Sequence, residues 1–301
     1  MIYLDSFHFP TFEEEDEFLA GYYKFNPASV KTPYPFKVLS QNGLYSLDFK
    51  EITILYGGNG SGKSTALNAI SNKLGLVRNS VYNKGDFQSD YLRMCDYDEA
   101  DIEDDLDLKD RATLITSDDI FKYMLDTRNR NAVMKRKINH AIDEWISLRN
   151  KNGKVSIQDV GLSVEEKMNL GLGRKRGLNR SQYIKAKAGT LTETFSNGET
   201  GFMKFVESIV PDKLYLLDEP ENSLSCALQI DLAKFIEDSA RYLGCQFIIA
   251  THSPFLLAME CAKIYNLDSD PVTISNFWEL PNMKLYYDLF KKYEGKFDAL
   301  S

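Results

Sequence analysis

The stretch GGNGSGKST, residues 57–65, decides the fold of this 301-residue chain. It fits the pattern G-x-x-x-x-G-K-[ST], with Lys63 and Ser64 at the last two fixed positions. An unbroken apolar run, Ile52–Tyr56, precedes it, and a helical pattern over Lys63–Leu74 follows it. A phosphate-binding loop requires this order of buried strand, glycine-rich loop and helix. The first candidate ligand is therefore a nucleoside triphosphate.

The chemistry of the loop suggests a role for each of its parts. Its backbone amides and the N-terminus of the following helix would bind phosphate oxygens, and its glycines would keep Cβ atoms out of the way. Lys63 would reach the β and γ phosphates, Ser64 would ligate Mg²⁺, and Thr65 would touch the α phosphate. The residues predicted to contact ATP are Gly57, Asn59, Gly60, Ser61, Gly62, Lys63, Ser64 and Thr65.

Composition restricts the class of protein. The chain is 43% hydrophobic and 27% charged, with a formal charge of −8, which is ordinary globular material and argues against broad non-specific DNA binding. Its apolar runs are too short to cross a membrane, and Met1–Pro10 does not resemble a signal peptide. We therefore expect a cytoplasmic protein with no direct membrane insertion. Four scattered cysteines predict reduced, buried thiols.

Apolar strands alternate with helical segments on both sides of the loop. Leu214–Asp218 and Gln246–Ala250 are two such strands, separated by a predicted helix over Ser223–Leu243 that ends at Gly244. This alternation predicts an α/β fold with a parallel core. The other strands predicted from composition are Met1–Phe9, Tyr34–Leu39, Gly43–Phe49 and Arg111–Thr116.

Three further segments have simpler interpretations. The acidic stretch Arg78–Asp110 is predicted to be a solvated excursion rather than a metal site. The spacing of Ile138, Ile142, Trp145 and Ile146 predicts one buried helical face. Near the C-terminus, aromatic side chains at helical spacing favour packing over base stacking; they are Phe277, Trp278, Tyr286, Tyr287, Phe290, Tyr293 and Phe297.

Two carboxylates and a histidine follow the predicted strands at their carboxyl ends. Asp218 would hold the metal, and Glu219, pointing another way, would act as general base toward the attacking water. His252 follows the next strand, at the edge where open α/β sheets bind ligands, and is predicted to contact the γ phosphate. Lys63, Glu219 and His252 are thus the predicted catalytic residues, and Ser64 and Asp218 the predicted metal ligands.

The order of motifs resembles that of non-transporter ABC-type ATPases, the group that contains RecF, the SMC heads and the OLD-type ATPases. Within it, the chain is similar to compact bacterial predicted ATPases of the AAA family. The motifs that carry the resemblance are Gly57–Thr65, Phe195–Glu199, Leu214–Pro220, Glu221–Ser225 and Thr251–Ser253. The resemblance implies a P-loop NTPase with a mixed-sheet core and an inserted helical lobe. The implied divisions are residues 1–117 and 201–301 for the core, and 118–200 for the lobe.

The resemblance also implies a dimer. In such ATPases a signature motif binds the γ phosphate of a nucleotide held by a second chain, and here Ser196 and Gly198 match that motif while its second glycine and its glutamine are replaced. The segment Asn222–Ser225 resembles the loop that crosses the interface. An ATP-dependent homodimer with bound ATP and Mg²⁺ is the implied assembly. The usual glutamine after a core strand has no counterpart, since Gln88 comes early and Ser117 or Asp118 occupies the junction.

Several functions fit these motifs. The leading hypothesis is an ATP-hydrolysing dimeric switch read by a protein partner or by DNA, in DNA maintenance or phage defence. The alternatives are the energising subunit of a membrane transporter and a nucleotide sensor with little turnover.

Tyr34 and Phe36 are candidates to stack on adenine. The basic residues that could contact DNA are Arg174, Lys175, Arg176, Arg180, Lys185 and Lys187.

Overall fold

The computed structural model describes residues 1–26, 32–78, 84–101, 107–152, 155, 179–188 and 197–298. The chain forms two compact units, one from Met1–Ile120 with Asn197–Ser301 and the other from Phe121–Ser196. The divisions predicted from sequence, 1–117, 118–200 and 201–301, stay a prediction. No helix among the described residues combines the length and the apolar character needed to cross a bilayer.

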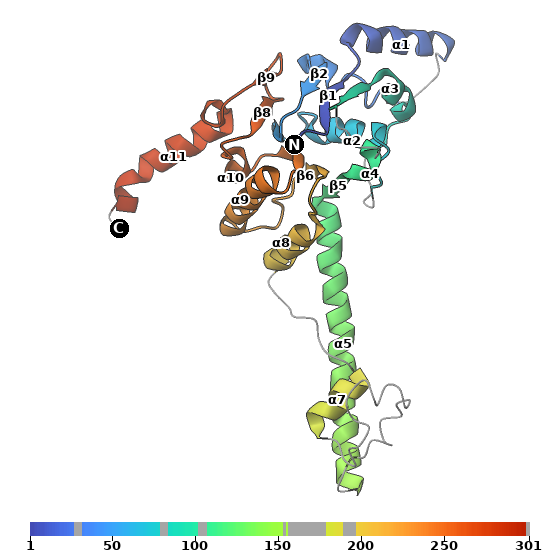
Figure 1. Ribbon diagram of the computed structural model, residues 1–301, viewed down its shortest axis with the longest axis vertical. Coiled ribbons are helices and arrows are strands. Elements are labelled where there is room, and N and C mark those ends of the chain that lie inside the picture. The colour runs from blue at the N-terminus through green and yellow to red at the C-terminus, as the bar shows by residue number, and fades with distance from the viewer. Residues whose placement is uncertain are drawn as a thin grey trace. The chain divides into compact units, whose positions relative to one another are not determined.

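A six-stranded sheet forms the centre of the first unit, in the order β5-β6-β7-β3-β8-β9 (Figure 1). The strands from β5 to β8 are parallel, and only β9 pairs antiparallel. This arrangement confirms the predicted α/β class. The strands are β3 (Ile52–Tyr56), β5 (Ala112–Thr116), β6 (Leu214–Asp218), β7 (Gln246–Thr251), β8 (Lys263–Asn266) and β9 (Thr273–Ile274).

A second, three-stranded antiparallel sheet belongs to the same unit, in the order β2-β1-β4. Its strands are β1 (Leu4–His8), β2 (Ser46–Asp48) and β4 (Asp96–Glu99). The acidic β4 lies within the stretch predicted to be a solvated excursion: its side chains are mostly exposed, as predicted, but its backbone pairs with β1 as a strand of the sheet, which was not predicted. The predicted strand at Tyr34–Leu39 was wrong, because this segment is built of turns, with Phe36 N–H donating to the Pro33 carbonyl.

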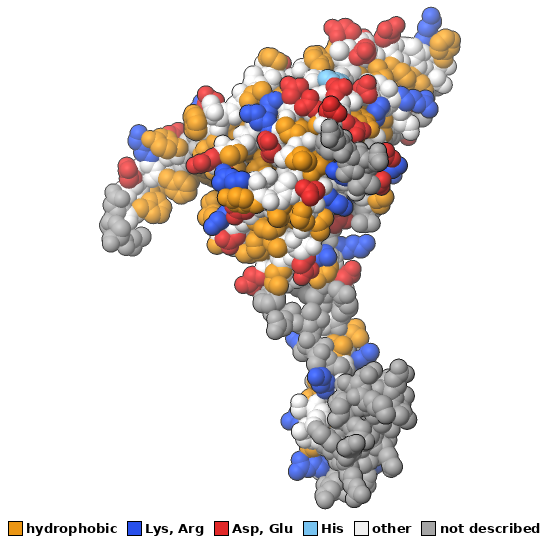
Figure 2. Space-filling view, in the orientation of Figure 1, with side chains coloured by type: hydrophobic (Ala, Val, Ile, Leu, Met, Phe, Trp, Pro, Cys, Tyr) orange, Lys and Arg blue, Asp and Glu red, His pale blue; other side chains and the backbone are white. Residues whose placement is uncertain are grey.

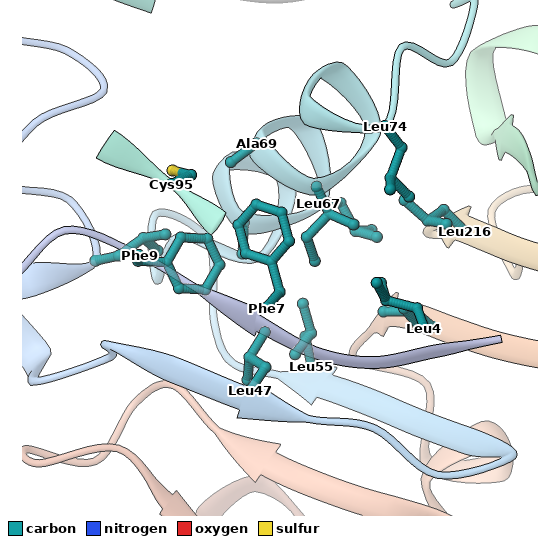
Figure 3. Packing of buried hydrophobic residues seen from close by; sticks show 14 of the residues in the cluster. Leu4, Phe7, Phe9, Leu47, Leu55, Leu67, Ala69, Leu74, Cys95 and Leu216 are labelled. Carbon is teal, nitrogen blue, oxygen red and sulfur yellow. The ribbon is translucent and has the colours of Figure 1, made fainter. Parts of the chain in front are cut away.

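The core lies between the two sheets and the helix that follows the loop (Figure 3). Leu4 and Phe7 from β1 meet Leu55 from β3 and Leu67 from α2 (Lys63–Lys73), and Leu216 from β6 joins the same cluster. Every residue of β3 and β6 is buried, as expected for parallel strands covered on both faces. The glycine-rich loop therefore starts from one of the most rigid parts of the molecule.

One buried amide side chain joins the two sheets. Gln246, at the start of β7, accepts hydrogen bonds through Oε1 from the backbone N–H groups of Tyr3 (2.8 Å) and Leu4 (3.0 Å). Its Nε2 donates to the carbonyls of Leu4 (2.8 Å) and Lys50 (3.3 Å). All four bonding positions of the amide are used, so the polar groups of β1 that face the larger sheet are satisfied in the core.

Helices cover the sheets and connect the strands (Figure 1). Besides α2, those of the first unit are α1 (Phe12–Phe25), α3 (Gln88–Met94), α4 (Leu108–Arg111), α8 (Asn197–Ser208), α9 (Cys226–Tyr242), α10 (Pro254–Leu257) and α11 (Pro281–Asp298). Short 3₁₀ turns lie at Ser40–Asn42 and Phe277–Glu279. The start of α5 (Ser117–Asn152) is capped, since Thr116 Oγ1 donates to Asp119 and accepts from the Asp119 N–H.

The second unit contains most of α5 together with α7 (Arg180–Ala188). Its small core holds Ala141, Val155, Tyr183 and Ala188. Of the predicted buried face, Ile138 and Trp145 pack against this cluster, whereas Ile146 is exposed.

Two expectations about burial were partly or wholly wrong. All four cysteines are free, but only Cys95 and Cys245 are buried, and Cys226 and Cys261 are exposed. The C-terminal aromatic side chains do not pack as predicted. Trp278 is 69% exposed, and α11 carries its aromatic residues on its surface rather than in a core. Helical spacing identified a face, but not whether this chain covers it.

The bridging role of Gln246 is testable by substitution. Gln246→Leu leaves the backbone N–H groups of Tyr3 and Leu4 and the Leu4 carbonyl without their Gln246 partner, and each such buried group costs about 1–3 kcal/mol. We expect the free energy of unfolding to fall by about 3 kcal/mol or more in urea titrations. The exposed Gln41→Leu serves as control and should change it by less than about 0.5 kcal/mol. A loss for Gln246→Leu no larger than that of the control would contradict the bridge.

Candidate functional site

The loop between β3 and α2 forms a tight cradle. A Cβ atom on Gly57 would lie 2.3 Å from Ser61 Oγ, so a side chain at this position would collide with the far side of the loop. Gly62 has a φ of +98°, and a Cβ there would lie 2.7 Å from Leu39 Cδ2. Both positions therefore require glycine, one for space and the other for space and backbone conformation.

The cradle is already organised around a positive charge. The buried Lys63 ammonium donates to the carbonyls of Gly57 (2.7 Å) and Gly58 (3.0 Å). Among the described residues, Ser61 Oγ is buried with no hydrogen-bond partner, and no side chain caps the N-terminus of α2. Unpaired donors beside a lysine at a helix N-terminus suit a phosphate group. The residues present thus fit the predicted ATP.

The two predicted metal ligands meet across the sheet. Ser64 Oγ, at the start of α2, donates to Asp218 Oδ1 at 2.9 Å, and Asp218 ends β6. A hydroxyl and a carboxylate side by side are oxygen ligands of the kind that Mg²⁺ takes in nucleotide sites. The structure therefore brings together a pair that is 154 residues apart in the sequence.

Arg78 lies on the same carboxylate and was not predicted. Its guanidinium is 3.6 Å from Asp218 Oδ2 and also bonds Asn68 Oδ1 of α2. Burial raises the pKa of Asp218, while the bond from Ser64 and the charge of Arg78 act in the opposite direction. Arg78 follows the end of α2 and belongs to no recognisable motif, so no sequence signal identified it.

Glu219 and His252 face each other at the ends of neighbouring strands. His252 Nδ1 is 3.7 Å from Glu219 Oε1, and Glu219 Oε2 accepts a 3.0 Å hydrogen bond from Asn222 Nδ2. Glu219 has a positive φ of 49°, and its N–H donates to the Ala250 carbonyl of β7. Asp218 and Glu219 therefore have separate partners, which is compatible with different roles for adjacent carboxylates.

Glu221 holds the segment Thr251–His252 in place through two hydrogen bonds. Its buried carboxylate accepts through Oε1 from Thr251 Oγ1 (2.6 Å) and from the His252 N–H (3.2 Å). Burial raises the pKa of Glu221, and these hydrogen bonds only partly offset it. In the sequence, Glu221 is recognisable only as part of a family motif, because an acid after a proline carries no sign of burial.

Two side chains outside the loop also contact it. Tyr34 Oη lies 3.3 Å from Thr65 Oγ1, whereas Phe36 is buried in the core and thus has no free face for a base. The Asp268 carboxylate accepts from the Gly58 N–H at 2.9 and 3.0 Å, which ties the first half of the loop to the segment after β8. Asn59 and Gly60, also predicted to contact ATP, are exposed at the tip of the loop.

The remaining predicted residues are only partly described. Ser196 lies outside the described residues, as do Arg174, Lys175 and Arg176, and Gly198 is the second residue of α8. Arg180, Lys185 and Lys187 are on α7, where Lys187 pairs with Glu144 at 2.9 Å. The described part of the chain contains no group of three or more His, Cys, Asp or Glu side chains placed to hold a metal.

Family comparison agrees with this geometry. The family model described as "ABC transporter" matches residues 42–222, which include the loop, Asp218 and Glu219. The chain belongs to the ABC transporter family. A second model, described as "AAA domain, putative AbiEii toxin, Type IV TA system", matches residues 195–258. The predicted ABC-type ATPase domain is therefore confirmed.

No curated protein matches the chain. Solved structures similar to it include a "putative metal-chelate type ABC transporter" in an inward-facing conformation, at 16% identity and a TM-score of 0.31, with 79% of this chain and 76% of that one covered. CbiO1 of the cbiONQ transporter complex from Clostridium perfringens is 15% identical, with a TM-score of 0.33 and coverages of 85% and 88%. An SMC head bound to the C-winged helix domain of ScpA is 16% identical, with a TM-score of 0.37 and coverages of 76% and 92%.

Adjacent glycines offer a matched test of the cradle. Gly57→Ala places a Cβ 2.3 Å from Ser61 Oγ, whereas a Cβ on Gly58 would lie 3.7 Å from Asp268 Oδ1, an ordinary contact. We expect Gly57→Ala to weaken ATP binding at least about tenfold, equivalent to about 1.4 kcal/mol, and Gly58→Ala to change it little. Titration with a fluorescent ATP analogue measures both. Equal effects of the two variants would show that steric closure of the cradle is not what matters.

Glu221 makes a prediction about pH. Because burial raises its pKa in the folded protein, the protonated carboxyl stabilises the fold below the unfolded pKa, and this contribution is lost as pH rises through the raised value. Glu221→Gln keeps an acceptor for Thr251 and removes the titration. We expect the variant to gain stability relative to the native chain as the pH rises above about 4.5, the ordinary pKa of a glutamate, in urea unfolding. The exposed Glu17→Gln should show no such trend, and a flat difference for Glu221→Gln would contradict the assignment.

Proposed function

We propose that the chain is an ATP-hydrolysing switch that closes into a homodimer when ATP is bound. The observation that carries the proposal is the meeting of three groups at one edge of the sheet: the Lys63 cradle, the Ser64–Asp218 pair and the Glu219–His252 pair. They come from the carboxyl ends of β3, β6 and β7, which are neighbours in the sheet. This is the edge where an open α/β sheet binds its ligand.

Each residue has a role in this proposal. Lys63 and the amides at the N-terminus of α2 bind the phosphates, and Thr65 and Tyr34 lie beside them. Ser64 and Asp218 hold the metal, which supplies charge neutralisation at the phosphates when bound. Glu219 takes the proton of the attacking water, and His252, 3.7 Å away, contacts the γ phosphate.

The dimer is supported by the segment that follows Glu219. Asn222, Ser223 and Ser225 are exposed, and Ser225 caps α9 by accepting from the Leu228 N–H. Because Asn222 also donates to Glu219, movement of this exposed segment would move the general base. A second chain that contacted the segment, and offered Ser196 and Gly198 to the γ phosphate, would complete the site. Hydrolysis would then depend on assembly.

The state of the switch would be read by a partner. We propose a protein partner or DNA, in DNA maintenance or phage defence. The basic residues of α7 offer only limited support for DNA, since one of them, Lys187, is already paired with Glu144. DNA-stimulated ATP turnover that falls when Arg180 and Lys185 are neutralised would identify DNA as the partner, and unaltered turnover would favour a protein.

Two native cysteines make the dimer testable. Cys226 is exposed and directly follows the segment Asn222–Ser225, whereas the exposed Cys261 lies elsewhere in the sequence and serves as an internal control. In a twofold dimer, surface near the axis meets its own copy. In Glu219→Gln, which should bind ATP without hydrolysing it, we expect Mg-ATP to raise the yield of chains joined at Cys226 by a short bis-maleimide at least about tenfold, since ordered groups reach high effective concentrations.

Two controls give the experiment its meaning. Lys63→Ala in the same background removes the cradle's charge and should abolish the increase, and Cys226→Ser should remove the cross-linked species. Peptide mapping assigns the linked cysteine. A cross-linking yield at Cys226 that does not respond to Mg-ATP, in protein shown to bind ATP, would contradict the dimer model. It would indicate an ATPase that acts without this interface.

A further inference from the structure

The C-terminal helix α11 carries a large apolar face that the described chain leaves open. Seven of its side chains are between 40% and 68% exposed, namely Leu285, Tyr286, Tyr287, Leu289, Phe290, Tyr293 and Phe297. Only its first turn is anchored, through buried Met283 and the buried Leu280 that precedes the helix. Apolar side chains and lysines are visible along this helix in Figure 2.

The spacing of this face is that of a helix pair. Tyr286, Phe290, Tyr293 and Phe297 follow Met283 at steps of three and four, a period of 3.5 residues. Two rings of this seam contact each other, since the centroids of Phe290 and Phe297 are 6.2 Å apart. A helix that packed against a sheet would need only the 3.6-residue pattern of a general amphipathic face.

We propose that α11 pairs with α11 of a second copy of this chain. Along the seam tyrosine and phenylalanine alternate, so an antiparallel partner places Tyr286 opposite Phe297 and Phe290 opposite Tyr293 in every layer. Each tyrosine hydroxyl then meets an apolar ring edge rather than another hydroxyl, and it can reach water at the rim. Antiparallel helices also have favourably opposed dipoles.

The charges beside the seam suit a second copy. In this alignment Glu294 falls beside Tyr287 of the other helix, and Lys296 beside Leu289, so no two like charges meet. The lysines lie along the rings, with Lys291 Nζ 5.4 Å from the Tyr287 ring and Lys296 Nζ 5.4 Å from the Tyr293 ring. Their stems can extend the apolar surface while the ammonium groups stay in water.

The exposed area also fits such a pair. Aromatic side chains bury 150–250 Å² each when covered, so the six half-exposed residues on or beside the seam, which exclude Leu285, offer on the order of 600 Å² per helix. A standard stable interface takes about 800 Å² from each partner. Interfaces of this size bind with micromolar or tighter affinity. The α11 contact involves none of the residues of the nucleotide site, so it requires no ATP.

The test is the mass in solution without nucleotide, measured by light scattering at about 100 µM, a concentration above a micromolar dissociation constant. We expect twice the 34.4 kDa of one chain. Phe290→Glu, which puts a charge into the seam, should give the single-chain mass. Gly295→Glu adds the same charge on the side of the helix opposite the seam, where a Cβ would meet nothing within 4 Å, and should keep the doubled mass. Far-ultraviolet circular dichroism confirms that both variants are folded.

The outcomes that overturn the pairing are distinct from those that bear on the nucleotide switch. A single-chain mass for the native chain, or a doubled mass that survives Phe290→Glu together with Tyr293→Glu, excludes α11 as the contact between copies. The first of these results would leave a different protein as the occupant of the face. Cross-linking at Cys226 by Mg-ATP, repeated in Phe290→Glu, reports on the switch whether or not α11 pairs.

Discussion

The parallel pairing of β3, β7 and β6 is the constraint on which the site depends. Leu55 of β3 lies opposite Ala250 of β7, and Ala250 lies opposite Asp218 of β6. Because the three strands run the same way, their carboxyl ends reach one edge together. This places the loop after β3, the acids after β6 and the histidine after β7 next to one another. A slip of one residue of β6 against β7 would turn Asp218 to the other face of the sheet and separate it from Ser64.

Most buried charged groups at this edge have hydrogen-bond or ion-pair partners, although Glu221 Oε2 has no hydrogen-bond partner among the described residues. Asp218 has Ser64 and Arg78, Glu221 has Thr251 and the His252 N–H, and Lys63 has two loop carbonyls. An unpaired buried charge would cost several kcal/mol. These bonds are also the ones that a nucleotide and a cation would have to share or replace. The site therefore consists of interactions poised for exchange, whereas Gln246 in the core satisfies backbone groups that have no alternative partner.

The parts of the fold that could be predicted from sequence are those whose cause is local. Ile52–Tyr56 is buried on both faces and reads as an apolar run, and the cradle is visible because only glycine fits at Gly57 and Gly62. The strand β4 was missed because it pairs with β1 through its backbone while its acidic side chains point to water. Arg78 and Glu221 were missed for a related reason. Their importance comes from a partner distant in sequence: Arg78 belongs to no motif, and the motif that contains Glu221 does not indicate its burial or its partners.

The aromatic residues of α11 were predicted to pack in a core, but they are exposed. An apolar pattern therefore identifies a helix face without indicating what covers that face. An aromatic stripe with the period of a helix pair leaves apolar surface uncovered within one chain. If α11 holds two chains together without ATP, closure of the nucleotide sites becomes an intramolecular step at an effective concentration that short tethers place in the millimolar range. ATP binding would then need to supply only the free-energy difference between the open and closed forms of one dimer. Weak contacts around Asn222–Ser225 would be sufficient for a switch that opens again after hydrolysis.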